Sequence, residues 1–263
     1  MSLKAIQVQA ALLVLFGASF ASCNSSQIKV QEAATQVATI PTETSAEVGN
    51  ETLKSDPDLS ARYSFPTKID PTKRYLFYLH GKIIEDQGLP AISPEFGEYK
   101  YEENLDALEG YGFVVISEQR HRDTDVGEYA KRIAGQVDEL IAAEVHPGAI
   151  TVVGASKGAA ITSRVSNIVS SSEVNYVLLG ACYQPMIDEW KQQGISLSGN
   201  VLAIYDSSDE YAASCQELFD FSNGKGLGRQ SEIVLHFGTG HCILYEPLIE
   251  WVLPTVQWAK QEW

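Results

Sequence analysis

The chain has 263 residues, of which 44% are hydrophobic, and this is enough to bury the core of one sizeable domain. Its formal net charge is −15, because 34 aspartates and glutamates outnumber 19 lysines and arginines. Nucleic-acid binding needs a basic face that displaces counterions, so this composition argues against a nucleic acid as partner.

The first 22 residues have the pattern of a secretory signal peptide. Lys4 gives the positively charged start, and residues 10–20 form an apolar run that is too short to span a membrane. The segment Phe20-Ala-Ser-Cys23 resembles a lipoprotein processing box. We therefore expect cleavage before Cys23, acylation of that cysteine and anchoring in the bacterial envelope. The alternative is an ordinary signal-peptidase site ending at Ala21, which would release a periplasmic or secreted protein.

Residues 23–60 are rich in Ser, Thr, Glu and Ala and have little periodic apolar content, so they predict a flexible tether. One domain at residues 61–263 accounts for the rest of the chain. There, strand-like apolar runs alternate with segments that have helical spacing, which predicts an α/β fold: a mostly parallel sheet with helices on both faces. The predicted elements before the serine motif are an edge strand at 61–65, a strand at 74–80, a loop at 81–98, a helix at 99–111, a strand at 112–117, a helix at 125–143 and a strand at 149–153. After it we expect a helix from 159, strands at 174–181 and 201–205, a helix that contains Cys215, a strand at 231–237 and a closing helix at 246–261.

The most informative motif is Gly-x-Ser-x-Gly at residues 154–158. An apolar strand leads into this motif and a helix follows at Ala159, so Ser156 lies on a tight strand-to-helix turn. Gly154 and Gly158 fit this position because such a turn leaves no room for side chains beside the serine. The motif predicts that Ser156 is a catalytic nucleophile, and the alternative is a structural turn serine.

Candidate acid and base residues follow in later loops. Asp209 lies just beyond the predicted strand at 201–205 and is the expected acid, with Asp206 as the alternative. His241 lies in the loop after the last predicted strand and is the expected base, whereas His236 falls within that strand. An acid that orients an imidazole lets the imidazole remove the serine proton, so this order of residues favours nucleophilic catalysis.

The predicted strand at 74–80 ends in His80 and Gly81, a turn that often supplies an oxyanion donor. We expect the backbone N–H groups of Lys82 and Lys157 to form the oxyanion hole. His80 itself is expected to be structural or to organise this turn.

The chain has a His-Gly turn, a Gly-x-Ser-x-Gly motif, an acid after one late strand and a histidine after the next. In these features the segment 61–263 resembles the α/β-hydrolase superfamily. It is most similar to the small, lidless esterase and dienelactone-hydrolase-like branches, because the intervals leave no room for a large cap domain. The stretch Leu-His-Gly-Lys-Ile-Ile-Glu-Asp-Gln-Gly at 79–88 resembles a poorly characterised bacterial subgroup. The resemblance implies a fold and a nucleophile, and it leaves the substrate open.

Three charged residues are candidates for substrate binding. Arg120 and Arg122 follow the carboxyl end of a predicted strand, which is the edge at which open parallel sheets bind ligands. A guanidinium there could bind a carboxylate or a carbonyl group. Glu85, after the His-Gly turn, is the third candidate. The alternative for all three is a solvent-exposed charged loop.

Three cysteines remain when Cys23 is assigned to the anchor. Cys182 ends a predicted strand and Cys215 lies on a later helix, so a disulfide between them is possible in an oxidising compartment. Cys242 is expected to be a small packed side chain. No Cys-x-x-Cys motif or His/Cys cluster in the sequence indicates a metal site.

The sequence therefore predicts an exported serine hydrolase that needs no cofactor. It would cleave a small-molecule or polymeric ester through Ser156, His241 and Asp209 by way of an acyl-enzyme. A peptidase or acyltransferase could use the same residues, because a fold and a set of catalytic residues do not identify the leaving group. A non-catalytic surface lipoprotein that uses the hydrolase scaffold for binding is a third interpretation.

Overall fold

The computed structural model describes residues 59–169 and 171–262 of the chain. The predicted signal peptide, the predicted acylation site Cys23 and all but the last residues of the predicted tether lie outside this part. Among the described residues, no helix is both long enough and apolar enough to cross a bilayer.

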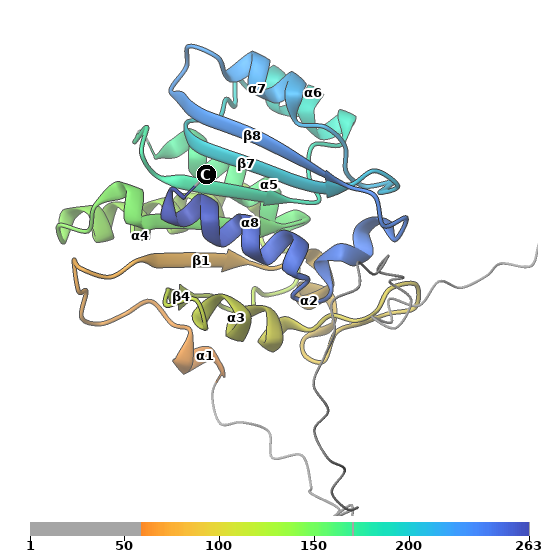
Figure 1. The fold of residues 1–263 in the computed structure, drawn as a ribbon, viewed down its shortest axis with the longest axis horizontal. Helices are drawn as coiled ribbons and strands as arrows, with labels where there is room; N and C mark the ends of the chain where they lie inside the picture. Colours follow the sequence, from red (N-terminus) through yellow and green to blue (C-terminus); the bar gives the residue numbers. More distant parts are fainter. Residues whose placement is uncertain (1–58, 170, 263) are drawn as a thin grey trace, which may run out of the picture.

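A six-stranded parallel sheet forms the centre of the domain (Figure 1). Its strands are β1 (Tyr75–Leu79), β4 (Val114–Ile116), β5 (Ile150–Ala155), β6 (Asn175–Leu179), β7 (Gly199–Asp206) and β8 (Leu227–Leu235). Their spatial order is β4-β1-β5-β6-β7-β8, and every neighbouring pair is parallel. All residues of β1, β5 and β6 are buried, which explains why these strands appear as continuous apolar runs in the sequence.

Alternating side chains of the strands contribute to two cores, one on each face of the sheet. Phe77 and Val152 point into the first core, whereas their neighbours Leu76 and Val153 point into the second. Figure 1 shows α3 and α8 in front of the sheet and α4 and α5 behind it. The first core includes side chains of α4 (Val126–Ala142), α5 (Lys157–Ile168), α6 (Gln184–Gln192) and α7 (Gln216–Ser222), and the second includes those of α2 (Lys82–Gln87), α3 (Tyr101–Glu109) and α8 (Ile249–Lys260).

The predicted alternation of strands and helices is confirmed, but two predictions near the start of the domain are wrong. The segment 61–65 is no strand: α1 (Leu59–Arg62) ends there, and Tyr63 buries its ring in the second core while its hydroxyl donates to Asp106. The predicted loop at 81–98 contains α2 and a small antiparallel pair, β2 (Ile92–Ser93) and β3 (Gly97–Glu98). The apolar side chain of Ile84, fully buried in the second core, explains why α2 forms.

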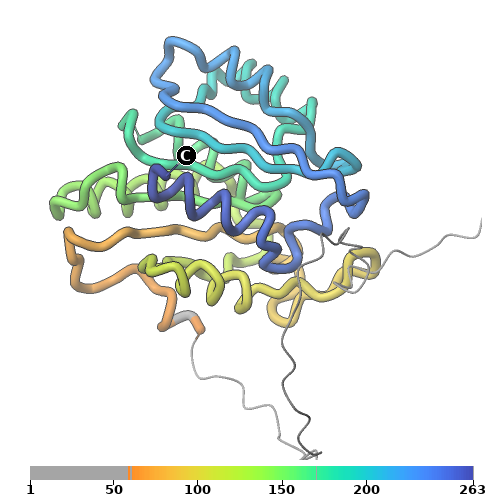
Figure 2. Tube along the Cα trace, viewed as in Figure 1, coloured from red at the N-terminus to blue at the C-terminus, as the bar shows by residue number. Residues whose placement is uncertain are grey.

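The carboxyl ends of all six strands lie at one edge of the sheet, because the strands are parallel. Figure 2 shows the connections after β1, β7 and β8 close together at this edge. A disulfide between Cys182 and Cys215, with Cα atoms 5.1 Å apart, joins the segment after β6 to the start of α7. The pairing that the sequence left open is therefore present, and it holds together two of the segments at this edge.

Candidate active site

Ser156 lies on the turn between β5 and α5 with backbone angles of φ 54° and ψ −116°. A positive φ is unfavourable for serine, so the surrounding structure must hold this conformation. A Cβ atom on Gly158 would lie 1.8 Å from the Leu79 carbonyl oxygen, and one on Gly154 would lie 2.2 Å from the Gly158 oxygen. The two glycines of the motif are therefore required by close contacts of the backbone, as expected for a strained serine turn.

His241 and Asp209 form a hydrogen-bonded pair at the same edge of the sheet. The distance between His241 Nδ1 and Asp209 Oδ2 is 2.7 Å, and the Asp209 carboxylate is buried. The backbone N–H of Tyr211 donates to the other carboxylate oxygen. An ionised carboxylate can only accept, so Nδ1 of His241 donates to it, and in the neutral imidazole Nε2 is then the acceptor.

Asp206, the alternative acid, is used in a different way. Its carboxylate accepts hydrogen bonds from the Ser208 N–H, the Ser208 hydroxyl and the Phe237 N–H. Burial alone would raise the pKa of Asp206, but these hydrogen bonds outweigh it and lower the pKa. Asp206 therefore fixes the turn that carries Asp209, and it is Asp209 that contacts His241.

The His241 ring lies against Gly180, at the end of β6. A Cβ atom on Gly180 would be 3.1 Å from Cε1 of His241. The preceding residue, Leu179, accepts a hydrogen bond from the N–H of Ser156. Ser156 and His241 therefore both lie beside the carboxyl end of β6. His236, the other histidine considered, is exposed beyond the end of β8 and hydrogen-bonds with Ser207.

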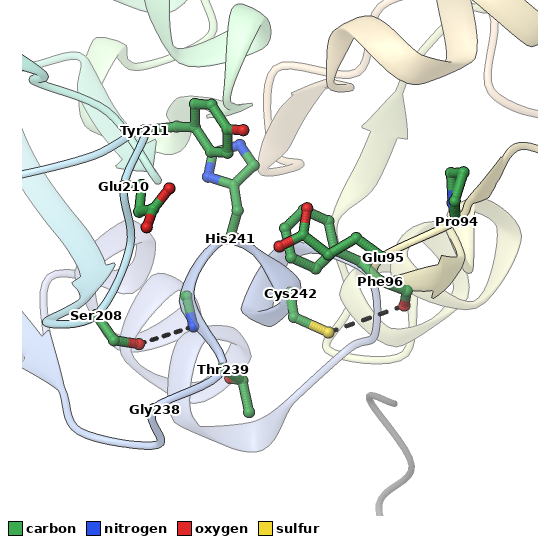
Figure 3. Close-up of a pocket in the computed structure, with 11 residues that line it drawn as sticks. Pro94, Glu95, Phe96, Ser208, Glu210, Tyr211, Gly238, Thr239, His241 and Cys242 are labelled. Carbon is green, nitrogen blue, oxygen red and sulfur yellow. Dashed lines mark hydrogen bonds between the residues drawn. The ribbon is translucent and has the colours of Figure 1, made fainter. Parts of the chain in front are cut away.

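A pocket of about 560 Å³ opens at His241 (Figure 3). Two aromatic rings flank the imidazole, with ring centroids 5.5 Å away for Tyr211 and 6.5 Å away for Phe96. Figure 3 shows the carboxylates of Glu95 and Glu210 on opposite sides of His241. A role for these four residues is not predictable from the sequence, because they lie in loops without a motif that indicates one. The lining residues are Pro94, Glu95, Phe96, Ser208, Glu210, Tyr211, Gly238, Thr239, Gly240, His241 and Cys242.

The two expected oxyanion donors begin helices next to Ser156. Lys157 is the first residue of α5 and Lys82 is the first residue of α2, so neither N–H has an acceptor within its own helix. A Cβ atom on Gly81 would be 3.7 Å from the Cβ of Ser156, which places the His-Gly turn directly beside the serine.

The expectation that Arg120 and Glu85 bind substrate does not fit their placement. Their side chains are 0% exposed and form an ion pair with each other, with Arg120 Nε 2.6 Å from Glu85 Oε1. Arg122 is exposed, and its guanidinium donates to the carbonyl oxygen of Asp86. None of the three residues lines the pocket at His241. The described part of the chain contains no group of three or more His, Cys, Asp or Glu side chains suited to a metal ion.

No family model and no curated protein matches the chain. It is similar to solved structures that include the esterase Pf2001 of Pyrococcus furiosus, SOBER1 of Arabidopsis thaliana, and Est1E of Butyrivibrio proteoclasticus with ferulic acid bound. The TM-scores are 0.47, 0.48 and 0.46, at sequence identities of 17%, 13% and 11%. The alignments cover 73%, 72% and 76% of this chain and 84%, 98% and 91% of the respective structures.

The strand order and the position of the serine turn identify the fold. Ser156 follows the central strand β5, and Asp209 and His241 follow β7 and β8 on one side of it. The chain has an α/β-hydrolase fold. Both the serine turn and the His–Asp pair come from loops at the carboxyl edge of the sheet, where this fold carries its functional groups.

His80, in the turn beside Ser156, is buried and neutral. Its Nε2 accepts a hydrogen bond from the Arg120 N–H over 2.9 Å, and its Nδ1 donates to the Gly81 oxygen over 2.7 Å. Burial and the nearby positive charge of Arg120 lower the pKa of His80 from 6.5 to about 3.

Acidification should therefore destabilise the domain through His80. Below pH 6.5 the unfolded chain binds a proton on this histidine, whereas the folded protein does so only near pH 3, so folding stability falls as the pH falls. We expect the stability advantage of the wild type over His80→Gln to shrink by about 2 kcal/mol between pH 7 and pH 5. Urea unfolding at both pH values measures this difference. The exposed His121 provides the control variant His121→Gln, and equal pH slopes for the wild type and His80→Gln would contradict the assignment.

Proposed function

We propose that the protein is a serine hydrolase that cleaves carboxylic esters. The observation that carries this proposal is the His241–Asp209 pair at the strand end to which the strained Ser156 is hydrogen-bonded. A serine and the two residue types that activate it, a histidine and an aspartate, come from three separate loops at one edge of the sheet. The esterases among the similar structures agree with this reaction class.

The arrangement supports a two-step mechanism. The Ser156 hydroxyl attacks the ester carbonyl while Nε2 of His241 accepts its proton, and Asp209 stabilises the imidazolium. The backbone N–H groups of Lys157 and Lys82 hold the oxyanion of the tetrahedral intermediate. His241 then protonates the departing alcohol, which leaves an acyl group on Ser156. A water molecule, deprotonated by His241, attacks this acyl group and releases the carboxylic acid with the serine restored.

Substitutions of the two candidate acids test this mechanism. Asp209→Asn should lower kcat about a thousandfold or more, because His241 loses the partner that fixes its tautomer and stabilises its charge. Asp206→Asn should retain kcat within about tenfold, since Asp206 contacts the turn rather than the imidazole. A small neutral ester is the suitable substrate, because Glu95 and Glu210 at the pocket would repel an anionic one.

Ser156→Ala gives the background rate, and circular dichroism confirms that each variant is folded. A greater loss in folded Asp206→Asn than in Asp209→Asn would contradict the assignment of the acid. Turnover of an amide but not of the matching ester would favour the peptidase alternative. A folded wild type that cleaves neither would favour the binding scaffold.

We further propose that the domain is exported and attached to the bacterial envelope through acylated Cys23, with residues 23–60 as a tether. The Cys182–Cys215 disulfide supports an oxidising compartment, where such bonds persist. When the full chain is expressed in bacteria fed with labelled palmitate, the wild type should incorporate the label and Cys23→Ala should not. Equal labelling of both chains would rule out Cys23 as the anchor, and an unlabelled but processed wild type would indicate a released protein.

A further inference from the structure

Four side chains with charged or titratable groups lie together behind the proposed oxyanion hole: His80, Glu85, Arg120 and Lys157. We call them the buried charge cluster. The side chains of Glu85 and Arg120 are 0% exposed, and that of Lys157 is 17% exposed. Charged groups are rarely buried to this degree, because their desolvation is costly unless each one is paired and hydrogen-bonded. The mechanism described above uses none of these side chains.

Glu85 connects the two segments that carry the oxyanion donors. It lies on α2, three residues after Lys82, and its Oε2 accepts a hydrogen bond from the Lys157 ammonium. Lys157 directly follows Ser156, and its ammonium also donates to the Thr124 oxygen over 2.8 Å. The carboxylate of Glu85 thus ties the helix after the His-Gly turn to the residue after the nucleophile.

Arg120 holds the same turn from the other side. Its Nε donates to Glu85 Oε1 over 2.6 Å, and its Nη2 donates to the carbonyl oxygen of His80. Its backbone N–H donates to Nε2 of His80, whose Nδ1 donates in turn to the Gly81 oxygen. The backbone of the His-Gly turn is therefore fixed by a continuous set of hydrogen bonds that includes Glu85.

We propose that Glu85 is a positioning residue for the oxyanion hole. By accepting from both Arg120 and Lys157, it fixes the distance between the N–H groups of Lys82 and Lys157 across the site of the reacting carbonyl. This placement of the two donors stabilises the transition state more than the bound ester, so it acts on kcat rather than on KM. This inference rests on the proposed ester hydrolysis.

Steady-state kinetics on a small neutral ester test the role of Glu85. Glu85→Gln should lower kcat roughly ten- to hundredfold with KM changed by less than about threefold, because a misplaced donor weakens binding of the oxyanion rather than of the ester. The inhibition constant of a trifluoromethyl ketone, which forms a tetrahedral adduct with the serine, should rise in proportion to the loss of kcat/KM. A merely structural role would reduce the amount of folded enzyme and so lower the apparent kcat, but it would leave the inhibition constant at its wild-type value.

Two further variants keep the test decisive. Asp86→Asn is the matched control, because Asp86 is the next residue on α2 and forms an exposed ion pair with Lys82, so kcat should stay within about twofold. If Glu85→Gln fails to fold, Lys157→Met breaks the same link while the Arg120–Glu85 pair remains, and it should lower kcat about tenfold. Wild-type kcat in a folded Lys157→Met or Glu85→Gln would overturn the positioning role alone. A wild type without ester hydrolysis would overturn the proposed function and this inference together.

Discussion

The structure of the site depends on the close approach of α5 to the end of β1. The helix begins so near this strand that one additional carbon atom on Gly158 would lie 1.8 Å from the Leu79 oxygen. This approach forces the positive φ of Ser156 and brings the serine beside the His-Gly turn, where a Cβ on Gly81 would be 3.7 Å from that of Ser156. Backbone packing therefore places Ser156 directly beside the His-Gly turn.

Asp209 and His241 lie on loops that are themselves restrained. Asp206 fixes the turn after β7, and the Ala213 N–H donates to the Ala181 oxygen next to the Cys182–Cys215 disulfide. The loop that carries Asp209 is therefore held at both ends. In the proposed mechanism such restraint would favour catalysis, because an imidazole that is already oriented needs no reorganisation when the proton moves. The buried ion pair of Arg120 and Glu85 restrains the His-Gly turn beside Ser156 in a similar way.

Much of the fold and part of the site were predictable from the sequence, for physical reasons. The central strands are buried on both faces, so they appear as apolar runs, and the glycines at 154 and 158 mark a turn that tolerates no side chain. The internal position of Arg120 and Glu85 was not predictable, because charged residues in a polar stretch usually face solvent and their partners lie 35 residues apart in the chain. Phe96 and Tyr211 were missed because tertiary contacts alone bring their loops to His241.

The proposed mechanism requires that Ser156 is an activated nucleophile. The most direct test is to treat the folded protein with a fluorophosphonate and to locate the adduct by peptide mass spectrometry. We expect one adduct on Ser156 that forms much more slowly in His241→Ala and is absent from Ser156→Ala. An adduct on another serine, or no adduct on the folded wild type, would contradict it.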